Sequence, residues 1–312
     1  MPILDKWDFR LGGVMLGFSS GVLWALYLYW MGHMVHLEEP QAWVLFAASS
    51  LLVVLINEFS AGMWLCLLLR RRLFERLVEY RGDLMRSLPL FFICPLGIFL
   101  YVCALSLTSE SNVAAVTAIY PIVALVFTRV LLGRAFKGKE VKAVGLSSLG
   151  LLAISGILSG TGGGFSSLGI LMAFGCAVAW GGEAVLCYSC SITKAPSYVL
   201  LVLRYFCSVV AVSLSLIVLL AWDPGVGSKL LTIWDGGAVI SVAMISLVGL
   251  LSYFAYYSSI AFIGPVRALN CNVTYMLWVF VFSFLERGHV GIHTLVGSAL
   301  ICAAVYVTGL KD

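Results

Sequence analysis

The chain has 312 residues, of which 62% are hydrophobic and 11% are charged, and its mean hydropathy is +1.04. A soluble protein of this length could not cover so much apolar surface, so a soluble globular domain is excluded. Apolar runs of about 20 residues recur along the whole sequence, and runs of this length are typical of membrane-spanning helices. We therefore predict an all-α integral membrane protein.

Ten spans are predicted in chain order. They cover residues 12–35, 44–69, 88–107, 112–132, 141–158, 168–190, 198–221, 237–260, 267–285 and 292–310. The segments between them are too short for a soluble domain. The net charge of +4 is small for such a chain, and no nucleic-acid partner is expected.

The distribution of Lys and Arg predicts the orientation in the membrane. Of the 19 basic residues, Lys229 and Arg287 fall on one side, Arg204 falls within a span, and the remaining sixteen fall on the side of the N-terminus. Because basic residues accumulate in cytoplasmic loops, the N-terminus is expected in the cytoplasm. The even number of spans brings the C-terminus back to the cytoplasm.

The two halves of the sequence resemble each other. GGVMLGFSSGVLW (12–24) aligns with LGILMAFGCAVAW (168–180), and AIYPIVALVF (118–127) aligns with VTYMLWVFVF (273–282). The alignment pairs Trp24 with Trp180, and it pairs Tyr120 with Tyr275.

Each half contains five predicted spans, so the second copy must cross the membrane in the opposite direction. We predict a first repeat over residues 1–158, a Gly-rich linker over 159–167, and an inverted repeat over 168–312. Inverted repeats are typical of transporters, which bind their substrate between the two repeats near the bilayer midplane.

Several Trp and Tyr residues lie well inside predicted spans, whereas these residue types usually mark the membrane interfaces. Trp278 shares a helical face with Tyr275, and Tyr256 belongs to a group of tyrosines in the eighth span. Packing in an apolar core is one explanation. The related aromatic residues of the two halves favour a central aromatic cage, whose ring faces each attract a cation by about 0.5–2 kcal/mol. Ring faces suit a quaternary ammonium group, which has no N–H donor.

Three ionisable side chains are predicted deep within spans, where charge is costly and is a candidate for function. Glu58 and Arg204 are most simply explained as a structural ion pair. Glu183 shares a helical face with Trp180, so its charge is expected beside the cage as a substrate or proton site. A hydroxyl on the substrate would need a polar partner, for which Asn270, Asn272 and Ser252 are unranked candidates.

Five motifs occur in a characteristic order, namely TAIYP (117–121), AVAWGGEAVL (177–186), LLVLRYF (200–206), LSYFAYY (251–257) and LNCNVTYMLW (269–278). In these motifs, and over most of the chain from about residue 110, the sequence resembles the bacterial choline permeases of the Lic type. That family belongs to the drug/metabolite transporter superfamily.

The resemblance implies a bacterial cytoplasmic-membrane protein with ten helices in two inverted halves that imports choline. It also implies a cage with Glu183 close by, formed by Trp24, Tyr120, Trp180, Tyr256, Tyr275 and Trp278. The sequence departs from the family pattern at Gly181-Gly182 and at Cys271, where a different pocket size is expected.

We therefore predict a permease that imports choline or a closely related quaternary amine by alternating access. The alternative is an exporter of metabolites or cationic drugs that exchanges a proton at Glu183. We do not expect an enzyme, because no candidate catalytic cluster of His, Asp or Cys is found beyond two histidine pairs at the outer ends of spans, His33/His36 and His289/His293. No cofactor and no metal are predicted, and the expected partners are the substrate and the lipid bilayer.

Overall fold

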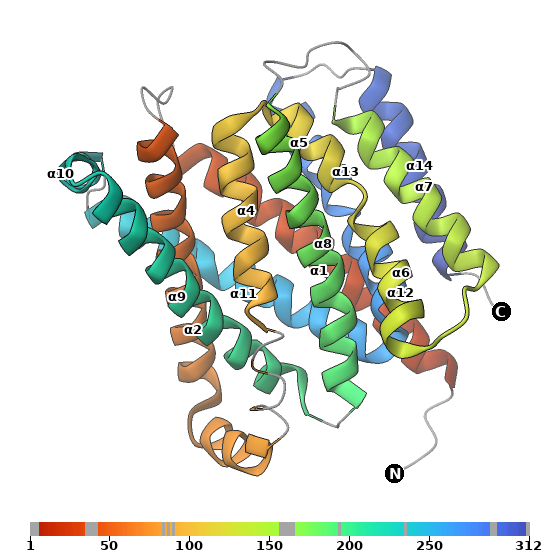
Figure 1. Cartoon of the computed structure of the whole chain (residues 1–312). Helices are drawn as coiled ribbons and strands as arrows, with labels where there is room; N and C mark the ends of the chain where they lie inside the picture. Colours follow the sequence, from red (N-terminus) through yellow and green to blue (C-terminus); the bar gives the residue numbers. More distant parts are fainter. Residues whose placement is uncertain are drawn as a thin grey trace.

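A computed structural model describes residues 6–34, 43–82, 85, 88, 91–155, 166–192, 195–233, 236–287 and 292–309, which are mostly helical and contain no strand. The helices, shown in Figure 1, are α1 (Lys6–Met34), α2 (Trp43–Glu79), α4 (Ile93–Leu107), α5 (Glu110–Thr117), α6 (Tyr120–Leu132), α7 (Gly138–Ile154), α8 (Ser167–Ile192), α9 (Ser197–Trp222), α10 (Gly225–Ile233), α11 (Gly236–Ile263), α12 (Pro265–Asn272), α13 (Tyr275–Arg287) and α14 (Ile292–Gly309).

Within the described residues, 6 helical segments are long and apolar enough to cross a membrane. They are Arg10–Trp30, Val44–Leu69, Asn112–Leu132, Ser167–Cys190, Ser197–Trp222 and Gly236–Ile263. Two shorter apolar helices, Ile93–Leu107 and Ile292–Val307, accompany them. The predicted all-helical, multi-pass class is therefore confirmed, whereas the number of ten spans stays a prediction.

The other two predicted spans are helical but differ from a long apolar helix. Helix α7 has only 17 residues and carries Glu140 in its first turn. The ninth predicted span is divided into α12 and α13, which have 8 and 13 residues. Neither of these pieces reaches the length of about 20 residues that crosses a bilayer unaided.

The fourth predicted span is also divided, into α5 and α6, and the two interruptions occupy aligned positions of the sequence. The first lies at Ala118–Ile119 and the second at Val273–Thr274. Pro121 follows the first interruption directly, at the start of α6, where its missing N–H costs little. At the second, the Thr274 hydroxyl donates to the Cys271 carbonyl over 2.7 Å, a local bond that competes with helix continuation.

Some expectations for the connections differ from the structure. Helix α10 was not predicted; it forms because Val226 and Leu230, four residues apart, are both buried against α2 and α9. Helix α2 runs beyond its apolar span to Glu79, which pairs with Arg76 over 2.6 Å. Most of the predicted linker 159–167 lies outside the described residues.

The contacts between helices repeat in the two halves of the chain. In this comparison α1 corresponds to α8, α2 to α9, α4 to α11, α5–α6 to α12–α13, and α7 to α14. Helix α1 packs on α11, and α4 correspondingly packs on α8. Helix α1 also contacts α12 and α13, while α8 contacts α5 and α6. Helix α2 packs on α9, and α7 packs on α14 at one edge of the bundle (Figure 1).

Two glycines allow α7 and α14 to approach closely. A Cβ atom on Gly150 would lie 2.7 Å from the Gly297 carbonyl oxygen, and a Cβ atom on Gly297 would lie 2.5 Å from the Gly150 carbonyl oxygen. Such distances are too short for any residue with a side chain. Small residues at helix crossings are a common means of close packing in membranes.

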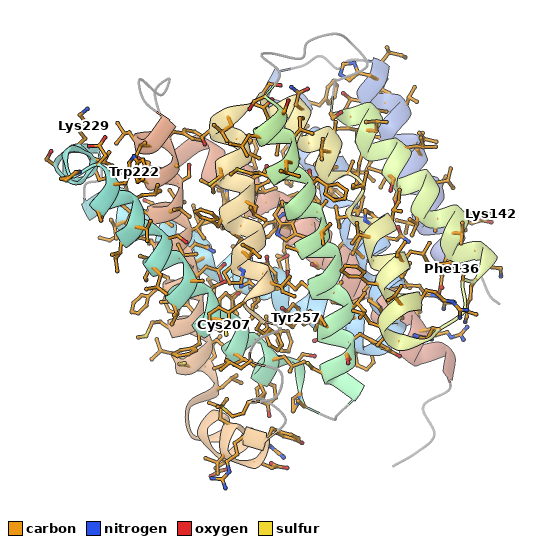
Figure 2. The ribbon with its side chains drawn as sticks, viewed as in Figure 1. Phe136, Lys142, Cys207, Trp222, Lys229 and Tyr257 are labelled. Atoms are coloured by element: carbon orange, nitrogen blue, oxygen red, sulfur yellow. The ribbon has the colours of Figure 1, made fainter. Side chains whose placement is uncertain are left out.

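The largest group of buried apolar residues lies around α8, α9 and α11. Tyr257 of α11 is fully buried in this group, near the middle of the bundle, whereas Trp222 at the end of α9 is 78% exposed (Figure 2). Polar residues of α8 and α11, together with others of α1 and α12, line a central cavity.

Candidate substrate site

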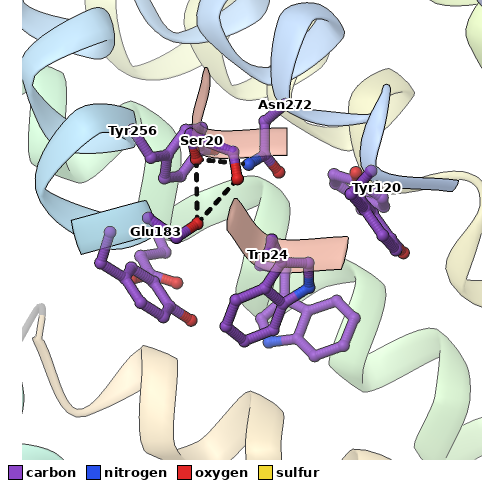
Figure 3. A pocket seen from close by; sticks show the side chains of 10 residues that line it. Ser20, Trp24, Tyr120, Glu183, Tyr256 and Asn272 are labelled. Carbon is purple, nitrogen blue, oxygen red and sulfur yellow. Dashed lines mark hydrogen bonds between the residues drawn. The ribbon is translucent and has the colours of Figure 1, made fainter. Parts of the chain in front are cut away.

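A cavity of about 100 Å³ lies between the helices of the two halves. For comparison, a dry cavity of about 150 Å³ holds benzene, so this volume is in the range of a small organic molecule. Six aromatic residues line it, namely Trp24, Tyr120, Trp180, Tyr253, Tyr256 and Tyr275. Four polar residues complete the lining, namely Ser20, Glu183, Ser252 and Asn272 (Figure 3).

The two interrupted helices bring one tyrosine each to this cavity. Tyr120 is the first residue of α6, and Tyr275 is the first residue of α13. Each interruption packs against a glycine of the opposite half. A Cβ on Gly21 of α1 would lie 3.1 Å from the Tyr275 nitrogen, and one on Gly181 of α8 would lie 2.7 Å from the Tyr120 carbonyl oxygen.

These close approaches place the tyrosines beside the tryptophans of the same glycine-bearing helices. Trp24 follows Gly21 by three residues, so both lie on one side of α1. Trp180 lies next to Gly181, and its ring centroid is 6.3 Å from that of Tyr120, with the ring planes at 86°. Trp24 and Trp180, from the uninterrupted helices α1 and α8, therefore meet the tyrosines of the interrupted helices around the cavity.

Neighbouring rings hold the tryptophans in place. The Trp180 ring lies 5.2 Å from the Tyr101 ring, and the Trp24 ring stacks on Tyr27 with centroids 4.9 Å apart. The edge of Tyr253 meets Trp24 at 5.5 Å. Contacts of this kind restrict ring rotation and leave preformed aromatic faces.

A buried cluster of charges adjoins the cavity. Arg204 of α9 is fully buried and forms a two-pronged bond to Glu58 of α2, with distances of 2.7 Å from Nη1 to Oε2 and 3.3 Å from Nη2 to Oε1. Its guanidinium carbon also lies 3.8 Å from the centre of the Tyr253 ring. Arg204 therefore has both a paired carboxylate and an aromatic face.

Glu183 of α8 joins the same cluster from the side of the cavity. Its Oε1 accepts a hydrogen bond of 2.7 Å from the Tyr257 hydroxyl and lies 3.4 Å from Arg204 Nε. Among the described residues Arg204 Nε has no hydrogen-bond partner, so this contact is an electrostatic one without the geometry of a hydrogen bond. Glu183 is thus held by one donor and attracted by a cation that Glu58 binds more fully.

The charges of this cluster do not cancel. With both carboxylates ionised, Glu58 and Glu183 carry two negative charges against the one positive charge of Arg204, an excess of one negative charge beside the cavity. In a site screened from water, an excess charge acts more strongly than it would in bulk solvent. The cluster therefore favours a ligand with a single positive charge.

The structure brings together five of the six residues expected in the cage, together with Glu183, and it places Trp278 elsewhere. Trp278 is not part of the cavity lining; its ring and that of Phe18 form a T-shaped pair with centroids 5.7 Å apart. Both Tyr275 and Trp278 lie in the first turn of α13, but the Trp278 ring packs against Phe18 of α1, and of the two only Tyr275 lines the cavity. The predicted pair of Glu58 and Arg204 is formed.

The three polar residues suggested as partners of a substrate hydroxyl differ in position. Asn272 and Ser252 line the cavity, whereas Asn270 is buried outside the lining and accepts a hydrogen bond from Ser147 over 2.8 Å. Gly181-Gly182 and Cys271 are not part of the lining either. These residues therefore do not set the size of the cavity by contacting it directly.

Sequence reasoning missed Ser20 and Tyr253 as lining residues and the contact between Glu183 and Arg204. Helical spacing could have indicated the first two, because Ser20 lies four residues before Trp24 and Tyr253 lies three before Tyr256. The contact between α8 and α9 had no comparable signal in the sequence.

Comparisons with known proteins agree with this architecture. Residues 11–156 match the model of the EamA-like transporter family. The match supports a membrane transporter of the drug/metabolite transporter type, and it supports transport rather than catalysis as the activity. No curated protein matches the chain.

Solved structures share the fold. One structure, described as "Crystal structure of protein", superimposes with a TM-score of 0.65 and 19% sequence identity over 95% of each chain. At this identity the similarity concerns the fold alone. The specificity of the cavity must therefore be argued from its own residues.

Proposed function

We propose that the protein is a membrane permease that imports choline or a closely related quaternary amine. The observation that carries this proposal is a cavity lined by six aromatic rings and adjoined by a charge cluster with one excess negative charge. A quaternary ammonium group has no N–H donor and binds through ring faces. The excess charge offsets part of the hydration that the cation loses on entering.

Glu183 is the residue that presents this charge to the substrate. It lines the cavity, whereas Glu58 is 2% exposed and outside the lining. Arg204 is shared between both carboxylates, but among the described residues its hydrogen bonds go to Glu58 alone. Glu183 therefore retains most of its attraction for a cation in the cavity.

The proposed direction of transport follows from charge. A substrate with one positive charge gains about 2.3 kcal/mol per 100 mV when it moves into a compartment of negative potential. This corresponds to an accumulation of about 50-fold without a coupling ion. The orientation assigned from Lys and Arg places the N-terminus in that compartment.

Alternating access is proposed to occur by movement of the two five-helix halves around the cavity. The matched helix contacts and the aligned interruptions at 118–119 and 273–274 support the proposed inverted repeat. Both halves contribute to the cavity, so a relative rotation would expose it first to one side and then to the other. On the Arg-rich side, Glu140 of α7 and Arg267 of α12 form a 3.5 Å contact between the halves.

Uptake of labelled choline into liposomes containing the purified protein tests the proposal. An inside-negative potential, set by a potassium gradient with valinomycin, should drive accumulation, and a pH gradient alone should not. Absence of both binding and uptake would refute the choice of substrate. Transport that depends on a pH gradient and on Glu183 would favour the alternative, an exporter with proton exchange.

Aromatic substitutions test whether the cavity is the binding site. Trp24→Ala and Trp180→Ala should each weaken choline binding at least about tenfold, because each removes a ring face. Trp278→Phe and Trp222→Phe are matched controls outside the cavity lining and should retain the wild-type affinity. Equal losses in all four variants would indicate a general effect on folding.

A further inference from the structure

Three polar side chains of the cavity lining form a hydrogen-bonded group. Ser20 comes from α1, Ser252 from α11 and Asn272 from α12. Ser252 Oγ lies 2.8 Å from the Ser20 carbonyl oxygen and 3.2 Å from Ser20 Oγ. Asn272 Nδ2 lies 2.8 Å from Ser20 Oγ. The dashed lines in Figure 3 mark this group.

The direction of each hydrogen bond in the group can be deduced by starting from the one backbone acceptor, the Ser20 carbonyl oxygen. The Ser20 carbonyl oxygen can only accept, so Ser252 donates its single hydroxyl proton to it. Ser252 Oγ then accepts from the Ser20 hydroxyl, which uses the single proton of Ser20. Ser20 Oγ in turn must accept, and this requires the amide nitrogen of Asn272 rather than its oxygen.

This order leaves the Asn272 side-chain oxygen as an acceptor. Figure 3 shows the Asn272 nitrogen turned towards Ser20 and the oxygen on the opposite side of the amide. No described residue donates a hydrogen bond to this oxygen, and Asn272 is part of the cavity lining. A ligand in the cavity therefore meets both a fixed acceptor, the Asn272 oxygen, and the Glu183 carboxylate.

We infer that Asn272 determines substrate specificity by accepting a hydrogen bond from a hydroxyl group of the substrate. The inference rests on the proposed function and narrows it to short hydroxylated quaternary ammonium compounds, such as choline. Ser20 and Ser252 are positioning residues, since they orient the Asn272 amide without needing to contact the substrate.

The same arrangement disfavours two related classes of compound. A quaternary ammonium without a hydroxyl leaves the Asn272 oxygen without a donor after the site has lost its water. A betaine carries a carboxylate, which cannot donate to this oxygen and brings a second negative charge close to Glu183. Choline should bind more tightly than either.

Binding measurements on the purified full-length protein test the inference with three ligands. These are choline, propyltrimethylammonium, in which a methyl group replaces the hydroxyl, and glycine betaine. Wild-type protein should bind choline about tenfold more tightly than propyltrimethylammonium, which corresponds to one hydrogen bond. Betaine should bind more weakly than both.

Asn272→Leu should lower the affinity for choline about tenfold and remove the preference over propyltrimethylammonium. Ser20→Ala should reduce the preference without removing it, because Asn272 loses its orienting partner but keeps its oxygen. Asn112→Ser, a change of an asparagine outside the cavity, should keep the wild-type preference. Asn272→Ser provides a second variant if the leucine variant is not recovered folded.

The outcomes distinguish this inference from the proposed function. If wild-type protein binds choline and propyltrimethylammonium equally, the role of Asn272 is wrong while the aromatic cage stands. If both Asn272 variants keep the full preference for choline, the inference is likewise overturned. If neither quaternary ligand binds the wild-type protein, the proposed function itself fails.

Discussion

Glu58 and Glu183 are two buried carboxylates that contact the same guanidinium, yet their surroundings differ. Glu58 accepts two hydrogen bonds from Arg204, on the side of α2 and α9. Glu183 has a 3.4 Å contact with Arg204 Nε and a hydrogen bond from Tyr257, on the side of the cavity. The difference shows that burial alone does not distinguish a structural charge from one that meets a ligand.

The two carboxylates differ in how many hydrogen bonds they accept from Arg204. A carboxylate with two charge-assisted bonds is already neutralised and holds helices together. Glu183 accepts one hydrogen bond from a neutral hydroxyl, and Arg204 Nε lies near it without hydrogen-bond geometry. Its carboxylate can therefore still attract a cationic ligand. Substitutions of Arg204, Glu183 and Tyr257 separate these two roles.

Arg204→Ala should have the largest effect, because it leaves two buried carboxylates without a positive charge. We expect a loss of about 3–5 kcal/mol in the free energy of unfolding, seen as a low yield of folded protein and a lower melting temperature. Arg76→Ala removes a partner from the exposed pair with Glu79 and should change little. Normal folding of Arg204→Ala with only a loss of affinity would assign Arg204 to the binding site instead.

Glu183→Gln should have a smaller effect on folding and a clear effect on binding. The amide can still accept from Tyr257, but the cavity loses its excess negative charge, so choline should bind about 10- to 100-fold more weakly. Residual transport should still respond to membrane potential. Calorimetry and proteoliposome uptake measure the two quantities, with Glu79→Gln as a control for removal of a surface carboxylate. Unchanged affinity together with an unchanged pH response would remove Glu183 from the mechanism.

Tyr257→Phe should have the smallest of the three effects. It removes one hydrogen bond to Glu183 and leaves the charge, so we expect choline affinity to fall by about three- to tenfold through a less fixed carboxylate. Tyr205→Phe is a matched control, because the Tyr205 hydroxyl has no hydrogen-bond partner among the described residues. If the control lost as much affinity as Tyr257→Phe, the effect would belong to aromatic packing and not to the Glu183 contact.

The class of fold and the central aromatic residues were accessible from the sequence because they depend on local patterns. Apolar run length indicated membrane helices, and the alignment of the two halves indicated Trp24, Tyr120, Trp180 and Tyr275. The orientation and the repeat boundaries stay predictions.

Other features depend on backbone events and tertiary contacts that helical spacing does not record. Trp278 was assigned to the cage on the assumption that it shares one face with Tyr275, but only Tyr275 lines the cavity. The approach of Arg204 to Glu183 depends on the packing of α8 against α9, and the orientation of Asn272 depends on Ser20, which lies 252 positions away in the chain.

The glycine contact between α7 and α14 constrains how the protein can evolve. Each glycine occupies the space that a side chain on the other would need, so the contact is reciprocal between the two halves. A substitution at Gly150 cannot be rescued by one at Gly297, because the second change can only add atoms to a space that is already full. If the halves descend from one duplicated ancestor, they are not free to diverge independently at this crossing.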